Sequence, residues 1–143
     1  MNLSSIVRFL PLLLASALLA PSTGRADTPE QIPGTTRVDA ETLIDIVGKD
    51  PDAVIIDART AEDRTGGYVE GSLSLPDTDA TPQTLSAAVP DKATAMIVYC
   101  NGVKCGRSVV VAKLAVAEGY AAVYWFRGGW DEWVAKGLPV AFD

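Results

Sequence analysis

Two cysteines, Cys100 and Cys105, stand out in a sequence of 143 residues that contains no histidine. Histidine is the commonest general base and metal ligand in proteins, so its absence excludes Ser-His-Asp and Cys-His catalysis, HExxH zinc sites and histidine-held haem. Two thiols also offer too few ligands for a metal ion. The remaining chemistry must come from the thiols, carboxylates, lysine, arginine or backbone dipoles, and we expect neither a metal nor a cofactor.

Cys100 is the better candidate for a nucleophile. It directly follows the apolar run of residues 95–99, which predicts a buried strand, and a glycine-containing loop then leads into a helix predicted over residues 107–118. Loop N–H groups and the positive end of the helix dipole would stabilise a thiolate at this position. Lys104 and Arg107 add positive charge to an otherwise acidic chain. The alternative for Cys100 is a buried structural thiol.

The residues after Cys100 are the predicted anion-binding loop. We expect its glycines to let the backbone curl so that several N–H groups point toward one small anion. The candidate binding residues are Asn101, Gly102, Val103, Lys104, Cys105, Gly106 and Arg107. Residues 100–106 are called the cysteine loop below.

The role of Cys105 stays open at this stage. In an exported protein two cysteines usually form a structural disulfide. Only four residues separate these two, so such a bond would restrict the unfolded chain little. Cys105 could instead be a resolving thiol that closes onto an oxidised or persulfidated Cys100, or an ordinary loop residue.

Residues 1–26 have the pattern of a secretory signal peptide. Arg8 precedes an uncharged apolar run over residues 9–20, and small residues lead to a cleavage site predicted before Asp27. The run is shorter than a membrane-spanning helix needs, although an uncleaved anchor helix is the alternative. We therefore expect a periplasmic or secreted protein without stable membrane insertion after cleavage.

The acidic balance restricts the partners. Cleavage would remove two arginines and no acidic residue, which changes the net charge from −6 to −8. Nucleic acids and anionic membrane surfaces are recognised by basic patches, so neither is expected. An anionic substrate requires a local positive field, which makes the few basic residues near a site informative.

The chain after the signal peptide predicts a short leader and one domain. Residues 27–36 are polar and hold two prolines and a glycine, which predicts a flexible leader. Residues 37–143 alternate strand and helix patterns, which predicts a three-layer α/β domain with a mostly parallel central sheet flanked by helices. We expect strands over 53–56, 73–75, 95–99 and 122–126, and helices from Asp39 to Gly48 and over 82–88, 107–118 and 130–136, with a helical turn after residue 60.

Three segments follow strands in this scheme, and ligands bind beyond the carboxyl ends of strands in open parallel sheets. They are residues 57–59, 100–107 and 127–129. Asp57 and Arg59, in the first, are expected to support the site as an ion pair or as backbone partners.

The motifs at these three places resemble the rhodanese family. VIIDARTAEDRTGGYVEGSLSLP is similar to the family's first strand and loop motif, IVYCNGVKCGRS to its active-site loop, and VYWFRGGWDEWVAKGLPV to its closing pattern. The similarity covers about residues 37–142, with the motifs in the family's order. It implies a rhodanese-like fold and a sulfurtransferase activity.

The resemblance also implies roles for individual residues. Cys100 matches the family's nucleophile, residues 101–106 its anion-cradling loop, and Asp57 and Arg59 its supporting positions. The implied reaction moves a sulfane sulfur from a small anion such as thiosulfate to cyanide or a thiol, through a persulfide on Cys100.

Two departures from the family pattern bear on substrate size and activity. Tyr68 stands where the family usually has histidine, and six residues separate Cys100 from Arg107, two more than in the common C-x-x-G-x-R-S loop. The C-N-G-x-x-C form resembles an exported subgroup found with oxidative, quinoprotein-linked metabolism, although Gly106 stands where that subgroup often has tryptophan. The enlarged loop could admit a larger substrate.

Other functions remain open from the sequence. The two cysteines could form a dithiol redox or sulfur-carrier module, or the domain could be catalytically silent and dock a partner. A phosphatase fits poorly, because Arg107 lies one residue beyond the C-x5-R spacing typical of such enzymes.

Overall fold

Five parallel strands form the central sheet of this protein, for which a computed structural model describes residues 27–143. The predicted signal peptide and its processing lie outside the described residues. The sheet order is β1-β6-β5-β2-β4, so β5 lies at the centre. The strands are β1 (Thr36–Val38), β2 (Val54–Asp57), β4 (Leu73–Ser74), β5 (Met96–Tyr99) and β6 (Val123–Phe126).

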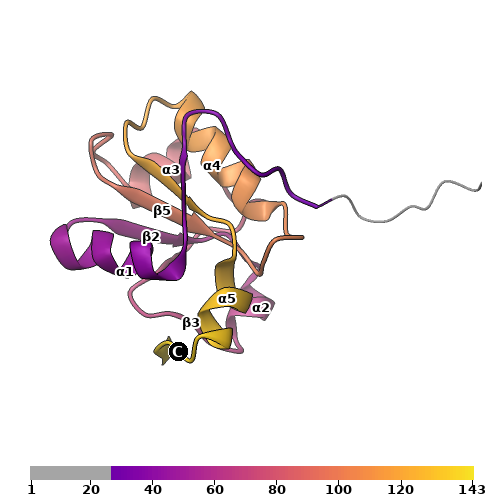
Figure 1. Cartoon of the computed structure of the whole chain (residues 1–143). Helices are drawn as coiled ribbons and strands as arrows, with labels where there is room; N and C mark the ends of the chain where they lie inside the picture. The colour runs from indigo at the N-terminus through magenta and orange to yellow at the C-terminus, as the bar shows by residue number, and fades with distance from the viewer. Residues whose placement is uncertain (1–26) are drawn as a thin grey trace, which may run out of the picture.

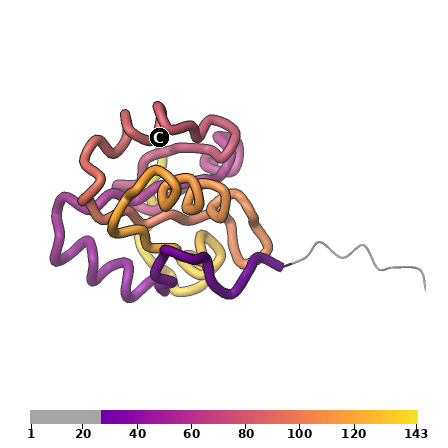
Figure 2. The backbone as a smooth tube through the Cα atoms, turned by 90° about the horizontal axis from the view of Figure 1, so that it is seen from above, coloured from indigo at the N-terminus to yellow at the C-terminus, as the bar shows by residue number. Residues whose placement is uncertain are grey.

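Helices cover both faces of this sheet (Figure 1), which confirms the predicted α/β class. One face carries α3 (Pro82–Ala88) and α4 (Arg107–Ala117), and the other carries α1 (Ala40–Lys49) and α5 (Gly129–Ala135). α4 packs against β5 and β6, and its coil lies near the centre of the view from above (Figure 2). A short helix, α2 (Ala61–Arg64), follows β2.

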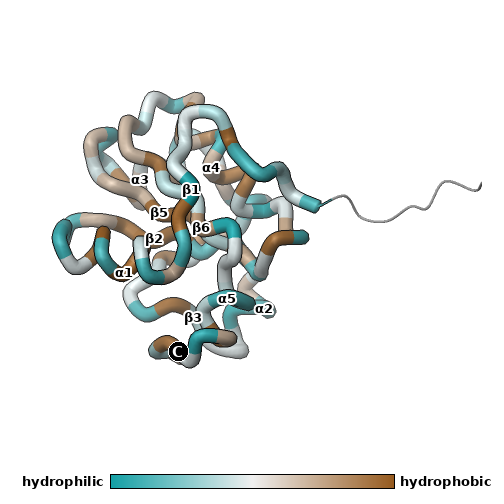
Figure 3. The backbone as a smooth tube through the Cα atoms, viewed as in Figure 1, coloured by the Kyte–Doolittle hydropathy of each residue, from teal (hydrophilic) through white to brown (hydrophobic). Residues whose placement is uncertain are grey.

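Each face of the sheet has its own hydrophobic core, because the strand residues alternate between the two faces. Ile56 and Val98 pack under α3 and α4, whereas Ile55 and Ile97 pack under α1 and α5. All four residues of β5 are buried. The hydrophobic colour in Figure 3 accordingly runs along β2 and β5 in the interior. The short apolar runs of the sequence thus form strands covered on both sides.

Capping residues determine where α1 and α3 begin, at the positions expected from the sequence. The Asp39 carboxylate accepts the Thr42 amide at 2.9 Å and caps α1, while Thr81 and Thr84 form a capping box before α3. The prediction for the end of α1 was wrong, because the helix continues through Gly48 to Lys49. Ile44 of this helix is 42% exposed, whereas Leu43 is buried.

Several short strands were not predicted. The edge strand β1 pairs with β6, and β3 (Tyr68–Val69) pairs antiparallel with β7 (Val140–Ala141) in a separate two-stranded sheet. Two or three residues are too few to show an alternating pattern.

The segment preceding β1 is packed, in contrast to the predicted flexible leader. Ile32 is 2% exposed in the core beneath α4, and Thr28 is 9% exposed. The Thr28 amide and hydroxyl both donate to the Val103 carbonyl, at 3.1 and 2.5 Å. Burial of Ile32 and these two hydrogen bonds hold the segment against the domain. Within residues 27–143, no helix has the length and apolar character to cross a membrane.

Candidate functional site

Cys100 and Cys105 are joined by a disulfide at the carboxyl end of the central strand. Their Cα atoms are 6.1 Å apart, and the Cys105 amide donates to the Gly102 carbonyl at 3.0 Å, which closes the cysteine loop into a turn. Cys100 is only 2% exposed, whereas Cys105 is half-buried. The two sulfur atoms therefore differ in their access to solvent.

A pocket of about 800 Å³ opens over this loop. It is lined by all seven residues predicted to bind an anion, so the structure brings the whole loop together. Four further residues complete the lining: Asp63, Asp77, Val110 and Asp131. Cys105, and not Cys100, contributes to the wall.

The amino-terminal end of α4 faces the same pocket, since Gly106 and Arg107 line it. Gly106 is the N-cap and supplies no side-chain acceptor, and the first turn contains no acidic residue. The first amides of α4 are therefore not occupied by a capping side chain. Free N–H groups and the helix dipole favour an anion at this position.

The pocket contains more acidic side chains than the sequence suggested. Arg107 was predicted to contact the anion, but its Nη1 forms an ion pair with Asp77 Oδ1 at 2.5 Å. Lys104 is exposed at the pocket wall. The carboxylates of Asp63 and Asp131 were not foreseen; within residues 27–143 no group of acidic or thiol side chains is arranged to hold a metal ion.

Asp63 fixes one side of the cysteine loop. The Asn101 amide group donates to Asp63 Oδ2 at 3.1 Å, and this hydrogen bond is the main cause of the lowered pKa of Asp63. Gly102 allows the loop to approach α5, because a Cβ atom at this position would collide with the Asp131 carboxylate. A side chain at this position would therefore require the Asp131 carboxylate to move.

The start of α5 holds the other side of the loop. The amides of Trp130 and Asp131 donate to the carbonyls of Cys100 and Asn101, at 2.9 and 2.8 Å. Gly129 has a φ of 56°, and a Cβ atom there would collide with the Cys100 carbonyl oxygen. The third predicted loop thus supports the site through its backbone.

Arg127, from the same loop, binds the N-terminal segment. Its guanidinium donates to the carbonyls of Thr28 and Pro29 at 3.1 and 3.0 Å and pairs with Glu30. It therefore anchors the N-terminal segment beside the cysteine loop.

Asp57 and Arg59 form a buried ion pair below the pocket. Their side chains are 0% and 1% exposed, and Arg59 Nη2 lies 2.7 Å from Asp57 Oδ2. Burial alone would lower the pKa of Arg59, but the hydrogen bonds and charge of Asp57 raise it above its ordinary value. The guanidinium also lies 4.6 Å from the centre of the Trp130 ring, so the pair connects β2 with α5.

Two partners of Asp57 were not predicted. The Tyr99 hydroxyl donates to Asp57 Oδ2 at 2.7 Å, and Arg64 donates to the same oxygen at 3.0 Å. Burial and the Asp57 charge raise the pKa of Tyr99 to about 12. Because Tyr99 directly precedes Cys100, this network fixes the end of β5 on which the cysteine loop begins.

Tyr68 lies outside the pocket lining. Its hydroxyl donates to Asp143 Oδ1 at 2.9 Å, and the Arg64 guanidinium lies 3.5 Å from its ring centre. This contact holds the β3–β7 sheet and the C-terminal residues together.

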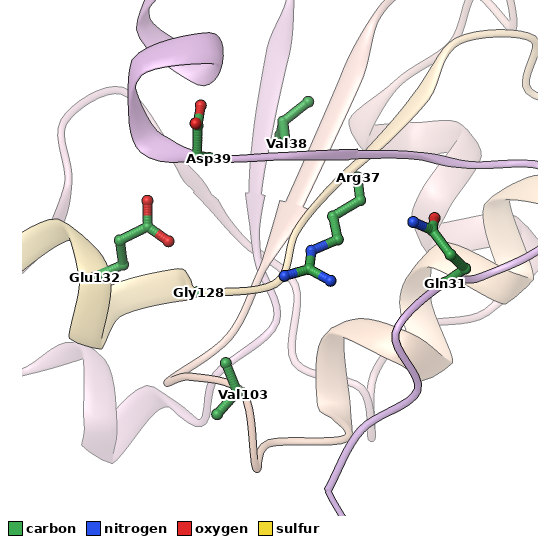
Figure 4. A pocket seen from close by; sticks show the side chains of 7 residues that line it. All are labelled: Gln31, Arg37, Val38, Asp39, Val103, Gly128 and Glu132. Carbon is green, nitrogen blue, oxygen red and sulfur yellow. The ribbon is translucent and has the colours of Figure 1, made fainter.

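A second pocket, of about 440 Å³, lies beside the cysteine loop (Figure 4). Its lining residues come from the N-terminal segment, β1, the cysteine loop, α5 and the N-caps of α1 and α5: Gln31, Arg37, Val38, Asp39, Val103, Gly128 and Glu132. The charged groups already have partners within the protein. Arg37 pairs with Glu30, Asp39 caps α1, and Glu132 accepts the Ala40 amide. Of the two cysteines only Cys105 lines a pocket, and that pocket is the larger one.

Comparisons with known proteins match this arrangement. The family model described as a rhodanese-like domain matches residues 39–136. A rhodanese domain-containing protein of Drosophila melanogaster is 29% identical over 98 residues, which cover 60% of this chain and 86% of that protein. A tRNA uridine(34) hydroxylase of Erwinia tasmaniensis is 31% identical over 101 residues, which cover 65% of this chain but only 28% of the hydroxylase.

Solved structures share the fold. A thiosulfate sulfurtransferase of Pseudomonas aeruginosa is 24% identical with a TM-score of 0.64, over 76% of this chain and 20% of that one. The polysulfide-sulfur transferase of Wolinella succinogenes is 19% identical with a TM-score of 0.63, over 77% of this chain and 80% of that one. The family model spans most of the chain and includes the cysteine loop. The chain therefore belongs to the family of proteins with a rhodanese-like domain.

Proposed function

We propose that this protein is an exported sulfurtransferase that moves a sulfane sulfur from a small donor such as thiosulfate to a thiol or cyanide. The carrier is a persulfide on Cys100. The family assignment supports sulfurtransferase activity at the level of the family. The proposal adds the donor, the acceptor and the residue that carries the sulfur.

The observation that carries the proposal is the position of Cys100 between the central strand and α4. Cys100 directly follows the carboxyl end of β5, and α4 begins at the pocket with no capping side chain. An anion bound there would be stabilised by backbone amides in place of a histidine. The same amides would stabilise the thiolate that starts the reaction.

The transfer occurs in two displacement steps. The Cys100 thiolate attacks the outer sulfur of thiosulfate, a sulfur–sulfur bond forms, and sulfite leaves with the electron pair of the broken bond. Cyanide then attacks the terminal sulfur of the persulfide, which gives thiocyanate and restores the thiolate. Each step conserves charge, and the sequence of steps is a ping-pong reaction.

The disulfide determines which form of the protein can accept sulfur. Cys100 bonded to Cys105 has no free thiolate, so the bond must first be reduced. We therefore expect the purified protein to be inactive until it is treated with a dithiol.

Intact mass spectrometry tests the proposal. Reduced protein exposed to thiosulfate should gain the mass of one sulfur atom, and cyanide should remove it as thiocyanate. Cys100→Ser should show no gain, while Cys105→Ser, the matched control, should still load. Wild-type protein that gains no sulfur and releases no sulfite would contradict the proposal.

Export is part of the proposal and rests on the pattern of residues 1–26. Expression of the complete chain in a Gram-negative host should deliver a periplasmic protein whose first residue is Asp27. A cytoplasmic protein that retains Met1 would contradict this part alone.

The disulfide favours a second candidate, a dithiol oxidoreductase that exchanges electrons without carrying sulfur. Such a protein would cycle between dithiol and disulfide but would neither release sulfite from thiosulfate nor gain mass. The same mass experiment therefore separates the two candidates.

A further inference from the structure

We propose that Cys105 is a second reacting thiol, which attacks the loaded Cys100 and releases the transferred sulfur as hydrosulfide. The inference rests on the proposed persulfide at Cys100 and adds a further activity to it. The disulfide present in the structure is then the product of each turnover, and a dithiol must reopen it.

Unequal access to the two sulfur atoms is the first argument. Cys105 lines the pocket and is half-buried, whereas Cys100 is 2% exposed and does not contribute to the lining. An incoming thiolate therefore reaches the Cys105 sulfur more readily. Attack at that sulfur expels Cys100 as the leaving thiolate, which is the form needed for loading.

The cysteine loop keeps its shape through contacts that do not involve the disulfide. The carbonyls of Cys100 and Asn101 accept amides from α5, the Val103 carbonyl accepts two hydrogen bonds from Thr28, and the Asn101 side chain binds Asp63. The bond also closes a loop with a sequence separation of only 5 residues, so it restricts the unfolded chain little. The disulfide can therefore open without loss of the site.

The reopening step consumes one dithiol. One thiolate of the dithiol attacks Cys105 Sγ, a mixed disulfide forms, and Cys100 leaves as a thiolate. The second thiol of the reductant then attacks the reductant's first sulfur, which is bonded to Cys105 Sγ in the mixed disulfide. Cys105 leaves as a thiolate, and the reductant becomes a cyclic disulfide.

The release step needs no further reagent. After thiosulfate has loaded Cys100, the Cys105 thiolate attacks Cys100 Sγ, the inner sulfur of the persulfide. The new bond is the disulfide of the structure, and the outer sulfur leaves as hydrosulfide with the electron pair of the bond it loses. Over the cycle, thiosulfate and a dithiol become sulfite, hydrosulfide, a cyclic disulfide and one proton.

A single-turnover experiment without oxygen tests the inference. Reduced wild-type protein and Cys105→Ser are loaded with thiosulfate, freed of donor and reductant by gel filtration, and followed by intact mass and by a hydrosulfide assay. Wild type should lose the added sulfur, release one hydrosulfide per chain and end two hydrogens lighter than the reduced protein. Cys105→Ser should retain its persulfide at least tenfold longer.

The outcomes separate this inference from the function on which it rests. Equal persulfide lifetimes in the two proteins would overturn the role of Cys105 while leaving the sulfurtransferase intact. Failure of both proteins to gain sulfur would overturn the proposed function itself. Thiocyanate production by loaded Cys105→Ser shows that the variant is folded, and hydrosulfide release by wild type gives a second measurement that needs no variant.

Discussion

Arg107 and Asp77 form an ion pair at the pocket, with Nη1 and Oδ1 2.5 Å apart. The pair neutralises the arginine that could otherwise attract an anionic donor. The same pocket contains the carboxylates of Asp63 and Asp131, so its three acidic groups outnumber the cations of Lys104 and Arg107. These carboxylates therefore repel a doubly charged anion such as thiosulfate before it reaches the amides of α4.

Asp77→Asn should improve the use of thiosulfate. The substitution frees Arg107 and removes one repulsive charge, and ion pairs at a partly exposed site contribute on the order of 1 kcal/mol, which corresponds to a few-fold increase in kcat/KM. Steady-state kinetics of the reduced protein would measure it. Asp45→Asn, which removes a carboxylate paired with Lys49 on the outer face of α1, is the matched control. An unchanged or lower kcat/KM would contradict the expected role of Asp77.

Gly129→Ala should destabilise the protein more than Gly119→Ala. Both glycines have positive φ, at 56° and 84°, but only at Gly129 would the new Cβ collide with the Cys100 carbonyl oxygen. The strain of the left-handed backbone costs about 1 to 2 kcal/mol at either position. The collision adds to this cost at Gly129. Gly129→Ala should therefore unfold at a lower midpoint denaturant concentration than Gly119→Ala. Equal midpoints would show that the contact with Cys100 relaxes freely.

Asp57→Asn should destabilise the fold strongly. It leaves the buried Arg59 guanidinium without its charged partner, and breaking a buried pair in this way typically costs about 3 to 5 kcal/mol. Asp45→Asn breaks an exposed pair and should change the free energy of unfolding by less than about 1 kcal/mol. Urea titrations of the two variants would compare them directly, and similar losses would contradict the supporting role of Asp57.

The stability of the fold should fall between pH 10 and about pH 12 through Tyr99. The folded protein raises the pKa of this phenol from 10.0 to about 12, so it favours the protonated form. The resulting stabilisation is complete below pH 10 and is lost as the pH rises through the folded pKa, by an amount on the order of 3 kcal/mol.

Tyr99→Phe isolates this effect from the other tyrosines. Since phenylalanine does not titrate, the difference in free energy of unfolding between wild type and Tyr99→Phe should shrink above pH 10. Tyr68 and Tyr120 also have raised pKa values, but both remain in the variant. A difference that stays constant up to pH 12 would contradict the expectation.

Much of the cysteine loop could be predicted because its residues are adjacent in the sequence. A buried strand, a glycine-containing turn and a helix fix the direction of such a loop, so residues 101–107 line one pocket as expected. The α/β class followed from the same alternation of patterns. These features depend on local sequence, where periodicity and capping residues carry the information.

The three carboxylates that line the pocket could not be predicted in the same way. Asp63, Asp77 and Asp131 come from three separate segments, and only the folded chain brings them to one pocket. Ile32 was missed for a related reason, because a single apolar residue in a polar stretch shows no periodicity. Its burial depends on α4, which begins 75 residues later in the sequence.

The contact between Thr28 and Val103 also has an electrostatic consequence. Asp27 directly precedes Thr28, whose side chain contacts Val103 of the cysteine loop. Cleavage before Asp27 would therefore create a new α-amino group on the residue next to this contact. Such a group ordinarily has a pKa near 8 and carries a positive charge at neutral pH. Removal of the signal peptide would thus place a cation close to a pocket rich in carboxylates, and maturation of the chain would alter the charge that an anionic donor encounters.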